Sequence, residues 1–566
     1  MLNYKMLTPQ AKKFNKNNPL PEYPRPYLVR DSFINLNGVW NYEITNSLSL
    51  PSAFTNEIVV PYPIESFLSG VRKDLKQNEY LCYNRQFELK KEFIKDIVVI
   101  NFGAVNQICD IYINNHLVAH HDGGYLPFSV DVTMFVSLGI NEISLVVENK
   151  PDLNYWVGKA GKARGGMWYT KTTGIWQTVW MESYSKEAIK NVTFTSDIHS
   201  GLVKGKIISS GNKFNLTVSY KGEVVLNKEV GKNFEFKIDN PKLWNLEEPN
   251  LYDVVIKNNS DEVKTYFAFR EFRIAGDRFY LNDSPIFING LLDQGYFSDG
   301  IYTPASYEAF EYDILKMKEL GFNALRKHIK VEPQMFYYLA DKLGMLILQD
   351  FPNSGKYNFI RDTALPTIGI TKIVDTRKYI SKERKQNFLK SGTELVNLLY
   401  PHPSVVYYTI FNEGWGQFDS DEFYRYFKGL DSSRVYDSTS GWFWQKESDC
   451  DSLHIYFKKV RLPKNSSRPI VLSEFGGYSW QVKGHSFNDS NEYGYKILKS
   501  KEELTNAFIE LYERDVIALI PNGLAGAIYT QVSDVEDETN GILTYDRQMV
   551  KLEEEKVIEL MKKVKY

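Results

Sequence analysis

From Ile274 to the C-terminus, short apolar strands alternate with helical segments, and this alternation restricts the fold more than any other feature of the chain. The helical segment at 303–321 is expected to begin with Thr303 as its N-cap and to stop at Gly321. Continuous apolar strands indicate a parallel sheet covered on both faces, and eight strand–helix units indicate a closed (β/α)8 barrel over 276–566. The eight strands are predicted in "PIFINGLLD", "FNALRKHI", "MLILQDF", "SVVYYTIFNE", "VYDSTSG", "SLHIYF", "PIVLSEFGG" and "LAGAIYTQVSD".

In the first half of the chain, apolar residues recur at every second position, as they do in β-strands with one buried face. "NEISLVVEN" alternates apolar and polar residues, and "IYINNHLV" places Asn114 and Asn115 at a predicted hairpin tip. These patterns predict a β-sandwich over 1–185. Shorter alternating strands, such as "NVTFTSDI", predict a small immunoglobulin-like sandwich over 186–275. The chain is therefore expected to hold three domains.

Composition limits the classes of partner. Lys and Arg number 68 and Asp and Glu number 70, so no net field draws in nucleic acid or an anionic membrane, and a small neutral partner is favoured. Three cysteines are an odd number without metal-ligand spacing, which favours buried thiols in a reducing compartment. No secretion signal or membrane span is evident, so we expect a cytoplasmic protein. Whether it forms a homo-oligomer stays open.

Polar side chains gather where the predicted barrel strands end, which is where reacting groups of such barrels lie. Two of them are glutamates: Glu413 ends the fourth strand directly after Asn412, and Glu474 ends the seventh. Two carboxylates facing each other across a barrel mouth are the minimum equipment for hydrolysing a glycosidic bond. The other candidates at strand ends are Asp293, Arg326, His328, Asp350, Trp442, His454, Tyr456 and Tyr529.

The motifs "FNEGWG" and "SEFGG", at the fourth and seventh strands, resemble the signatures of glycoside hydrolase family 2, which includes β-galactosidases, β-glucuronidases and β-mannosidases. The likeness covers nearly the whole chain. "GIWQTVWME" resembles the family's sugar-binding-type sandwich, "PKLWNLEEPNLYDVVI" the end of its immunoglobulin-like domain, and "FYLNDSPIFINGLLDQ" the start of its barrel.

The resemblance implies a role for several residues. Glu413 would be the general acid/base and Glu474 the nucleophile of a retaining mechanism. Asn412 would hydrogen-bond the 2-hydroxyl of the sugar, where contacts strengthen in the transition state. Tyr456 would orient Glu474, Arg326 would keep it ionised, and Tyr529 would line the sugar subsite.

The motifs indicate the mechanism more closely than the identity of the sugar. We expect an exo-acting enzyme on terminal β-D-galactosides. "LRKHI" and "GLLDQGY" depart from the family pattern at the sugar-facing rim. Ile542 stands where the uronate-binding lysine of family β-glucuronidases is expected, which disfavours a uronic acid. A β-galactofuranoside, a β-mannoside or a β-glucuronide are the alternatives. Trp442, Trp444 and Trp480 are candidates to stack on sugar rings.

Two further segments have competing interpretations. "GKAGKARGG" (158–166) lacks the residue a phosphate loop needs after its lysine, so we expect a sandwich loop that can reach over the barrel mouth. "DVEDE" (534–538) suits a structural divalent cation less well than a solvated loop. The chemistry itself needs no cofactor. From another class, the chain could be a carbohydrate-binding protein without activity, but the two glutamates argue against this.

Overall fold

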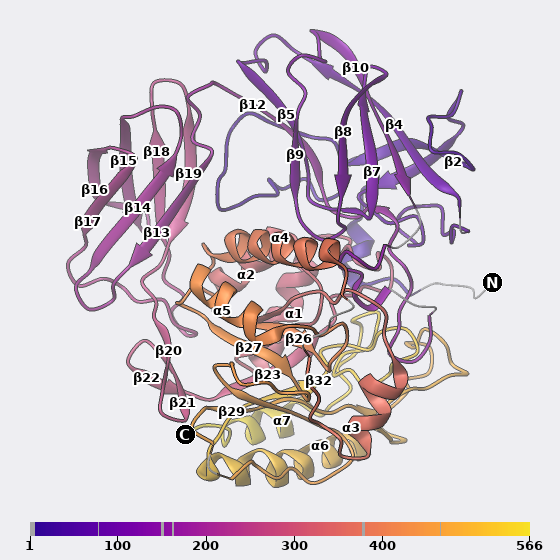
Figure 1. Ribbon diagram of the computed structural model, residues 1–566, viewed down its shortest axis with the longest axis vertical. Helices are drawn as coiled ribbons and strands as arrows, with labels where there is room; N and C mark the ends of the chain where they lie inside the picture. Colours follow the sequence, from indigo (N-terminus) through magenta and orange to yellow (C-terminus); the bar gives the residue numbers. More distant parts are fainter. Residues whose placement is uncertain (1–5, 77, 149–151, 161–163, 376–379, 465) are drawn as a thin grey trace.

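The computed structural model describes residues 6–76, 78–148, 152–160, 164–375, 380–464 and 466–566. Two β-sandwiches lie above a barrel in Figure 1, one from the N-terminal part of the chain and one from residues 191–267. The predicted class of fold is therefore confirmed. We retain 1–185, 186–275 and 276–566 as the proposed division into domains.

The first sandwich packs a six-stranded sheet, in the order β3-β2-β4-β10-β7-β8, against a four-stranded sheet, β1-β12-β5-β9. Asn114 and Asn115 form the β7–β8 turn with φ of 48° and 67°, the left-handed region that Asn tolerates. The strands are β1 (Phe33–Asn35), β2 (Gly38–Thr45), β3 (Asn56–Val60), β4 (Tyr80–Leu89), β5 (Ile97–Phe102), β7 (Ile108–Ile113), β8 (His116–Asp122), β9 (Phe128–Asp131), β10 (Gly139–Glu148) and β12 (Val179–Tyr184), with η1 (Pro9–Lys13) before them and the pair β6 (Val105–Asn106) and β11 (Gly174–Ile175) beside them.

The second sandwich is smaller and wholly antiparallel. Sheet β13-β14-β17 faces sheet β16-β15-β18-β19, and their inner faces share one apolar core around Val203, Leu216 and Val254. Its strands are β13 (Asn191–Ser196), β14 (Leu202–Ile208), β15 (Phe214–Tyr220), β16 (Glu223–Val230), β17 (Asn233–Lys237), β18 (Tyr252–Lys257) and β19 (Glu262–Phe267).

The barrel is a sheet of eight parallel strands in the order β27-β26-β25-β24-β23-β32-β29-β28, and β27 contacts β28 to bring the edges together. Its strands are β23 (Ile288–Asp293), β24 (Ala324–Lys327), β25 (Leu346–Asp350), β26 (Val405–Asn412), β27 (Val435–Ser440), β28 (Asp451–Ile455), β29 (Ile470–Gly476) and β32 (Leu524–Thr530). A three-stranded sheet, β20 (Phe272–Ala275), β21 (Arg278–Leu281) and β22 (Ser284–Ile286), packs Phe279 into the core of the barrel.

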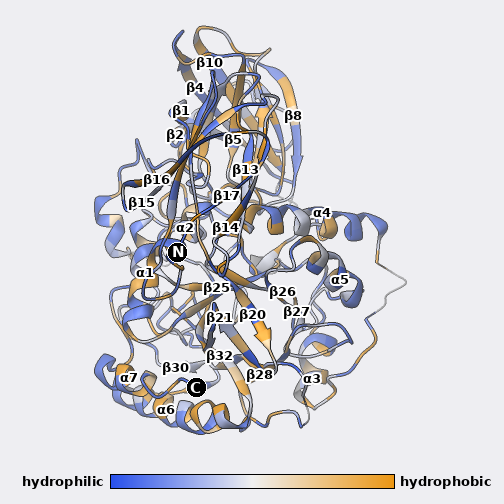
Figure 2. Cartoon of the chain, turned by 90° about the vertical axis from the view of Figure 1, so that its left-hand side faces the viewer, coloured by the Kyte–Doolittle hydropathy of each residue, from blue (hydrophilic) through white to orange (hydrophobic). Residues whose placement is uncertain are grey.

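Helices cover the outside of the barrel, and α4 and α6 show hydrophilic and hydrophobic residues side by side in Figure 2, as amphipathic helices do. The helical segments are α1 (Glu308–Glu319), α2 (Gln334–Leu343), η3 (Ile360–Ala364), α3 (Leu365–Thr367), α4 (Lys382–Leu399), α5 (Ser420–Leu430), α6 (Lys501–Asp515), η4 (Ile517–Asn522) and α7 (Glu554–Met561). Within the described parts of the chain, no helix is both long and apolar enough to cross a bilayer.

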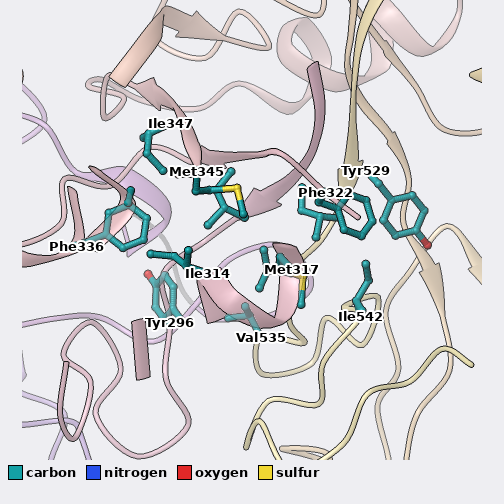
Figure 3. Packing of buried hydrophobic residues seen from close by; sticks show 14 of the residues in the cluster. Tyr296, Ile314, Met317, Phe322, Phe336, Met345, Ile347, Tyr529, Val535 and Ile542 are labelled. Carbon is teal, nitrogen blue, oxygen red and sulfur yellow. The ribbon is translucent and has the colours of Figure 1, made fainter. Parts of the chain in front are cut away.

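The helix predicted at 303–321 begins later than expected. Its first helical residue is Glu308, and Thr303 is buried, with its hydroxyl donating to the carbonyls of Pro61 and Trp176 at 3.2 and 2.5 Å. Thr303 therefore joins the barrel to the first sandwich instead of capping the helix. Ile314 and Met317 point into the apolar cluster of Figure 3, as the helical period predicts.

Candidate active site

The two glutamates lie together at the mouth of the barrel. Glu413 follows the last residue of β26 and has a φ of 53°, and its N–H donates to the carbonyl of Ser440 at 2.9 Å. Glu474 lies within β29 and its side chain is 5% exposed, against 23% for Glu413. One carboxyl oxygen of Glu413, one of Glu474 and a ring nitrogen of His454 all lie within 4.8 Å of one another.

His454, in β28, stands between the two carboxyl groups. Its Nδ1 is 2.8 Å from Oε1 of Glu413 and 3.6 Å from Oε2 of Glu474. Its Nε2 is 3.0 Å from the hydroxyl of Ser440, so both ring nitrogens have partners. The ring is thus held at one orientation, in contact with both candidate catalytic groups.

Arg326, in β24, connects four barrel strands beneath the glutamates and is 1% exposed. Its guanidinium donates to Oε1 of Glu474 at 3.2 Å and to Oδ1 of Asn412 at 2.8 Å. Two further donors reach Oδ1 of Asp350 and the carbonyl of Ser473, both at 2.9 Å. The planar guanidinium therefore holds the carboxylate of Glu474 and the carboxamide of Asn412 in fixed positions next to each other.

Tyr456 follows β28 and donates its hydroxyl to Oε2 of Glu474 at 2.5 Å. A second contact, of 3.2 Å, joins the same hydroxyl to that of Thr530 at the end of β32. The ring stacks on Tyr495 with a centroid distance of 3.7 Å and an angle of 11°. The hydroxyl is therefore held on the carboxylate by a rigid aromatic stack.

Burial alone would raise the pKa of Glu474. The charges of His454 and Arg326 and the hydrogen bond from Tyr456 outweigh it, and the pKa falls to about 2. Glu474 is therefore ionised at neutral pH, as a nucleophile must be.

Asp350 and His328 form a second layer beneath Glu474. Asp350 is fully buried and its Oδ2 lies 2.7 Å from Nδ1 of His328, while its other oxygen holds Arg326. Burial lowers the pKa of His328, so the ring is neutral at neutral pH and acts as a hydrogen-bond partner of Asp350. Both residues thus hold Arg326 and Glu474 in place.

Two predicted substrate-binding residues lie elsewhere. Asp293 pairs with Lys327 at 2.6 Å, and the ammonium of Lys327 lies over the ring of Phe336 in α2, behind the strands. Successive strand residues face opposite sides, and Asp293 is on the helix side of β23. The structure therefore does not bring Asp293 to the two glutamates, and its role in substrate binding stays a prediction.

Tyr529 also faces the helix layer. Its ring packs 4.9 Å from that of Phe508 in α6, and it is 2% exposed within the apolar cluster shown in Figure 3. Its neighbour Thr530 faces the mouth instead and contacts Tyr456. The structure therefore places Tyr529 among the apolar residues behind β32, and its role in the sugar subsite stays a prediction.

The tryptophans predicted to stack on sugars occupy different places. Trp442 packs edge-on against His454, with a centroid distance of 5.6 Å and an angle of 71°. Trp480 is partly buried and donates its backbone N–H to the carbonyl of Thr539 at 3.3 Å. Trp444 donates its indole N–H to Ser452 and is 37% exposed. Of the three, Trp442 lies against the residues that contact both glutamates.

The loop 158–166 of the first sandwich contacts the C-terminal part of the chain through Arg164, which pairs with Asp537 at 3.4 Å, and its residues 161–163 lie outside the described residues. Val157 donates its N–H to the carbonyl of Asn353 at 2.9 Å, and Trp168 packs against Trp415 with centroids 4.8 Å apart. Burial raises the pKa of Glu538, and the positive charge of Lys159 partly offsets that rise. The sandwich therefore contributes side chains to the barrel mouth.

The acidic run 534–538 is buried, so the prediction of a solvated loop is wrong. Asp534 pairs with Lys551 at 2.7 Å, and Glu536 accepts the N–H of Thr170 at 3.0 Å. Burial raises the pKa of Glu536 to about 7 and that of Asp534 to about 6. Glu536 therefore fastens the loop after β32 to the first sandwich, whereas Asp534 joins it to Lys551 within the C-terminal part of the chain.

Among the residues of the site that were not predicted are Thr530, Tyr495 and Glu538. Thr530 lies within the predicted strand "LAGAIYTQVSD", directly after Tyr529, so its position was a usable signal. Tyr495 precedes the two-residue strand β31 (Lys496–Ile497), which pairs with β30 (Tyr478–Ser479), and no periodicity marks such short strands. Glu538 lies within the acidic run, and a run of charged residues predicts exposure to solvent, so its burial was not expected.

The sequence profiles of one family match the chain from residue 31 to residue 552. They are the sugar binding domain of glycosyl hydrolases family 2 (31–185), the central domain of that family (176–270) and its TIM barrel domain (272–552). A β-galactosidase of Priestia megaterium is 22% identical over 77% of this chain, and a putative β-glucuronidase of Formosa agariphila is 25% identical over 67%. The chain spans 45% and 46% of these two relatives, less than half of each.

Solved structures show the same fold. A β-D-glucuronidase of Dictyoglomus thermophilum superimposes with a TM-score of 0.76 at 20% identity, covering 95% of this chain and 98% of that one. A β-galacturonidase of Eisenbergiella tayi gives a TM-score of 0.70 at 18% identity, with coverage of 95% and 97%. With three domain profiles matched in order along most of its length, the chain belongs to glycosyl hydrolases family 2.

Proposed function

We propose that the chain is a retaining exo-β-glycosidase that uses Glu413 and Glu474 in a double displacement. The observation that carries this is the approach of the two carboxyl groups, which bring one oxygen each within 4.8 Å. Retaining enzymes place these groups about 5 to 5.5 Å apart, whereas inverting enzymes leave roughly 6.5 to 9.5 Å for a water molecule. The approach of one oxygen from each group to within 4.8 Å is below the range of inverting enzymes and supports retention.

In this mechanism Glu474 attacks the anomeric carbon while Glu413 protonates the departing oxygen, which forms a covalent glycosyl-enzyme. Glu413 then takes a proton from water, which releases the sugar with its β configuration. Arg326 and Tyr456 hold Glu474 ionised and oriented. Asn412, held by Arg326, is placed to bind the 2-hydroxyl, where contacts strengthen in the transition state.

For the sugar we propose a neutral hexoside of the β-D-galactoside type. The buried carboxyl group of Glu538 interacts electrostatically with Glu474 and would repel a uronate. Ile542 is buried, and its backbone N–H donates to the carbonyl of Gln531 at 2.9 Å, so no cation stands at that position. These features support a glycone without charge.

A β-glucuronide is the second candidate, and one observation favours it. The positive charge of Lys159 acts on both Glu538 and His328, so an ammonium group lies within reach of the barrel mouth. Several similar proteins are also named β-glucuronidases. A uronate carboxylate paired with Lys159 would then replace the interaction with Glu538.

The test is a panel of 4-nitrophenyl β-glycosides with galactose, glucuronic acid, mannose and galactofuranose, followed by NMR of the first-formed product. We expect turnover, retention of the β anomer, and preference for the galactoside. Preference for the glucuronide would select the second candidate. Binding without turnover of any member would support a carbohydrate-binding protein, and an inverted product would refute the mechanism.

We also propose that no metal takes part. The spacing of Glu413, His454 and Glu474 would suit a metal ion, but the guanidinium of Arg326 already supplies positive charge 3.2 Å from Glu474. Prolonged dialysis against EDTA should leave kcat unchanged. Loss of activity that returns with a single divalent cation would contradict this part of the proposal.

A further inference from the structure

Three aromatic rings from three different segments pack together beside Glu413. Trp415 lies in the turn after Glu413, Tyr357 follows β25, and Trp168 comes from the loop of the first sandwich. The ring of Trp168 lies edge-on to Trp415 at 4.8 Å and to Tyr357 at 5.1 Å, and Tyr357 is 6.2 Å from Trp415. The charge of Glu413 acts on the hydroxyl of Tyr357. We call Trp168, Tyr357 and Trp415 the aromatic trio.

An exposed apolar strip follows Tyr357 along the chain. It comprises five large side chains within 16 residues, with exposed fractions between 45% and 81%: Phe359, Ile360, Ile368, Ile370 and Val374. Arg361, within this segment, donates to the carbonyl of Gly414 at 3.3 Å, and the carbonyl of Thr371 accepts the N–H of Phe443 at 2.9 Å. The strip therefore borders the turn that carries Glu413. Exposed apolar groups gathered in this way usually mark a binding surface.

The position of this surface relative to the chemistry points to its occupant. In the proposed reaction Glu413 protonates the glycosidic oxygen, so the group attached to that oxygen leaves on the side of Glu413. Glu474, on the other side, faces the anomeric carbon of the sugar that stays. Atoms beyond the glycosidic oxygen therefore extend over the turn toward the aromatic trio.

We propose that the aromatic trio and the apolar strip form the aglycone subsite, and that it takes an apolar aglycone, aryl or alkyl, in preference to a second sugar. This inference rests on the proposed function. A sugar would bring hydroxyl groups that must be hydrogen-bonded once water is excluded, whereas Phe359, Ile360 and Ile368 offer hydrocarbon. Burying an apolar chain against them removes apolar surface from water on both sides.

Alkyl glycosides test the proposal without a change in leaving-group chemistry. Methyl, butyl and hexyl β-glycosides of one sugar release alcohols of similar basicity, so a rise in kcat/KM with chain length reports apolar contact. Full burial of one methylene is worth about fourfold. We therefore expect the hexyl glycoside to exceed the methyl glycoside by at least about tenfold in the wild type, and to exceed a disaccharide of the same glycone.

Two variants locate the effect. Trp168→Ala, and separately Phe359→Ser with Ile360→Ser, should bring the hexyl-to-methyl ratio of kcat/KM toward one. The matched control is Met134→Ser with Leu138→Ser, which removes two exposed apolar side chains of the first sandwich, 88% and 60% exposed, and should keep the wild-type ratio. A ratio near one in the wild type, or a ratio that survives both subsite variants, would overturn the proposal.

Two further measurements separate the alternatives. A glycosyl fluoride has no aglycone, so failure of the wild type to hydrolyse the fluoride of any sugar would refute the proposed function itself. Turnover of the fluoride with no chain-length dependence would refute the aglycone subsite alone. Sedimentation tests whether the apolar strip instead joins two copies of the chain. A wild-type dimer that the variant Phe359→Ser with Ile360→Ser dissociates, together with a hexyl-to-methyl ratio of kcat/KM near one, would show that it does and would overturn the proposal.

Discussion

Tyr456→Phe tests whether the hydroxyl on Glu474 acts in the second half of the reaction. The hydroxyl donates to Oε2 of Glu474 at 2.5 Å, and a hydrogen bond to a charged group is worth about 1.5 to 3 kcal/mol. Glu474 loses its charge when it attacks the sugar and regains it when the glycosyl-enzyme is hydrolysed. The hydrogen bond therefore assists deglycosylation, where a carboxylate is re-formed, more than glycosylation.

The expected result follows from that asymmetry. With an activated aryl glycoside, whose hydrolysis is limited by deglycosylation, kcat should fall roughly 10- to 150-fold, which is the rate equivalent of that energy. KM should fall as well, because the intermediate accumulates, and rapid mixing should show a burst of phenol. The stack on Tyr495, at 3.7 Å, is kept by phenylalanine, so the fold should be retained.

Steady-state and rapid-quench kinetics on 2,4-dinitrophenyl glycosides give both parameters, and circular dichroism checks the fold. Tyr495→Phe is the matched control, since it removes a hydroxyl from the partner ring of the same stack, and it should lose less of kcat than Tyr456→Phe. An equal fall in kcat and kcat/KM without a burst, or a kcat close to wild type, would refute the reasoning.

Three other predictions concern single carboxyl groups. Glu474→Ala should lose several orders of magnitude in kcat/KM on every leaving group, because the covalent step is gone; wild-type turnover in this variant would refute the glycosidase proposal. Glu413→Ala should still release activated phenols, and added azide should restore turnover and give a β-glycosyl azide by NMR; no response to azide would refute its role as acid/base. Glu536 has a pKa raised to about 7 by burial, above its ordinary 4.5, so its stabilising contribution is complete below about pH 4.5 and is lost as pH rises through 7. Melting temperatures between pH 5 and 8 should therefore fall less in Glu536→Gln than in the wild type, and parallel curves would contradict this.

The barrel and the two glutamates could be predicted because both depend on local pattern. Each barrel strand is a continuous apolar run, and each glutamate ends such a run. The side of the strand on which a polar residue lies was harder to predict. Register shifts between Leu453 and His454, and between Leu472 and Phe475, break the regular alternation at the strand ends. Counting alternate residues therefore does not give the side that faces the mouth.

Contacts between distant segments account for the rest. Asp293 ends β23 and Tyr529 is the last residue but one of β32, but both face the helix layer, where Lys327 and α6 provide partners. Trp168 reaches the barrel from the first sandwich. The acidic run at 534–538 has the composition of a solvated loop, but contacts with Thr170 of the first sandwich and with Lys551 bury it. Such contacts depend on how the domains pack, and no local pattern records that.

Trapping the covalent intermediate tests the central claim most directly. A 2-deoxy-2-fluoro glycosyl fluoride of the preferred sugar slows both steps but leaves a good leaving group, so the glycosyl-enzyme should accumulate. Mass spectrometry of the intact protein should show one added fluorosugar, and peptide mapping should place it on Glu474, with no adduct in Glu474→Gln. Inactivation without a covalent adduct, or a label on Glu413 or any other residue, would contradict the assignment of Glu474 as the nucleophile.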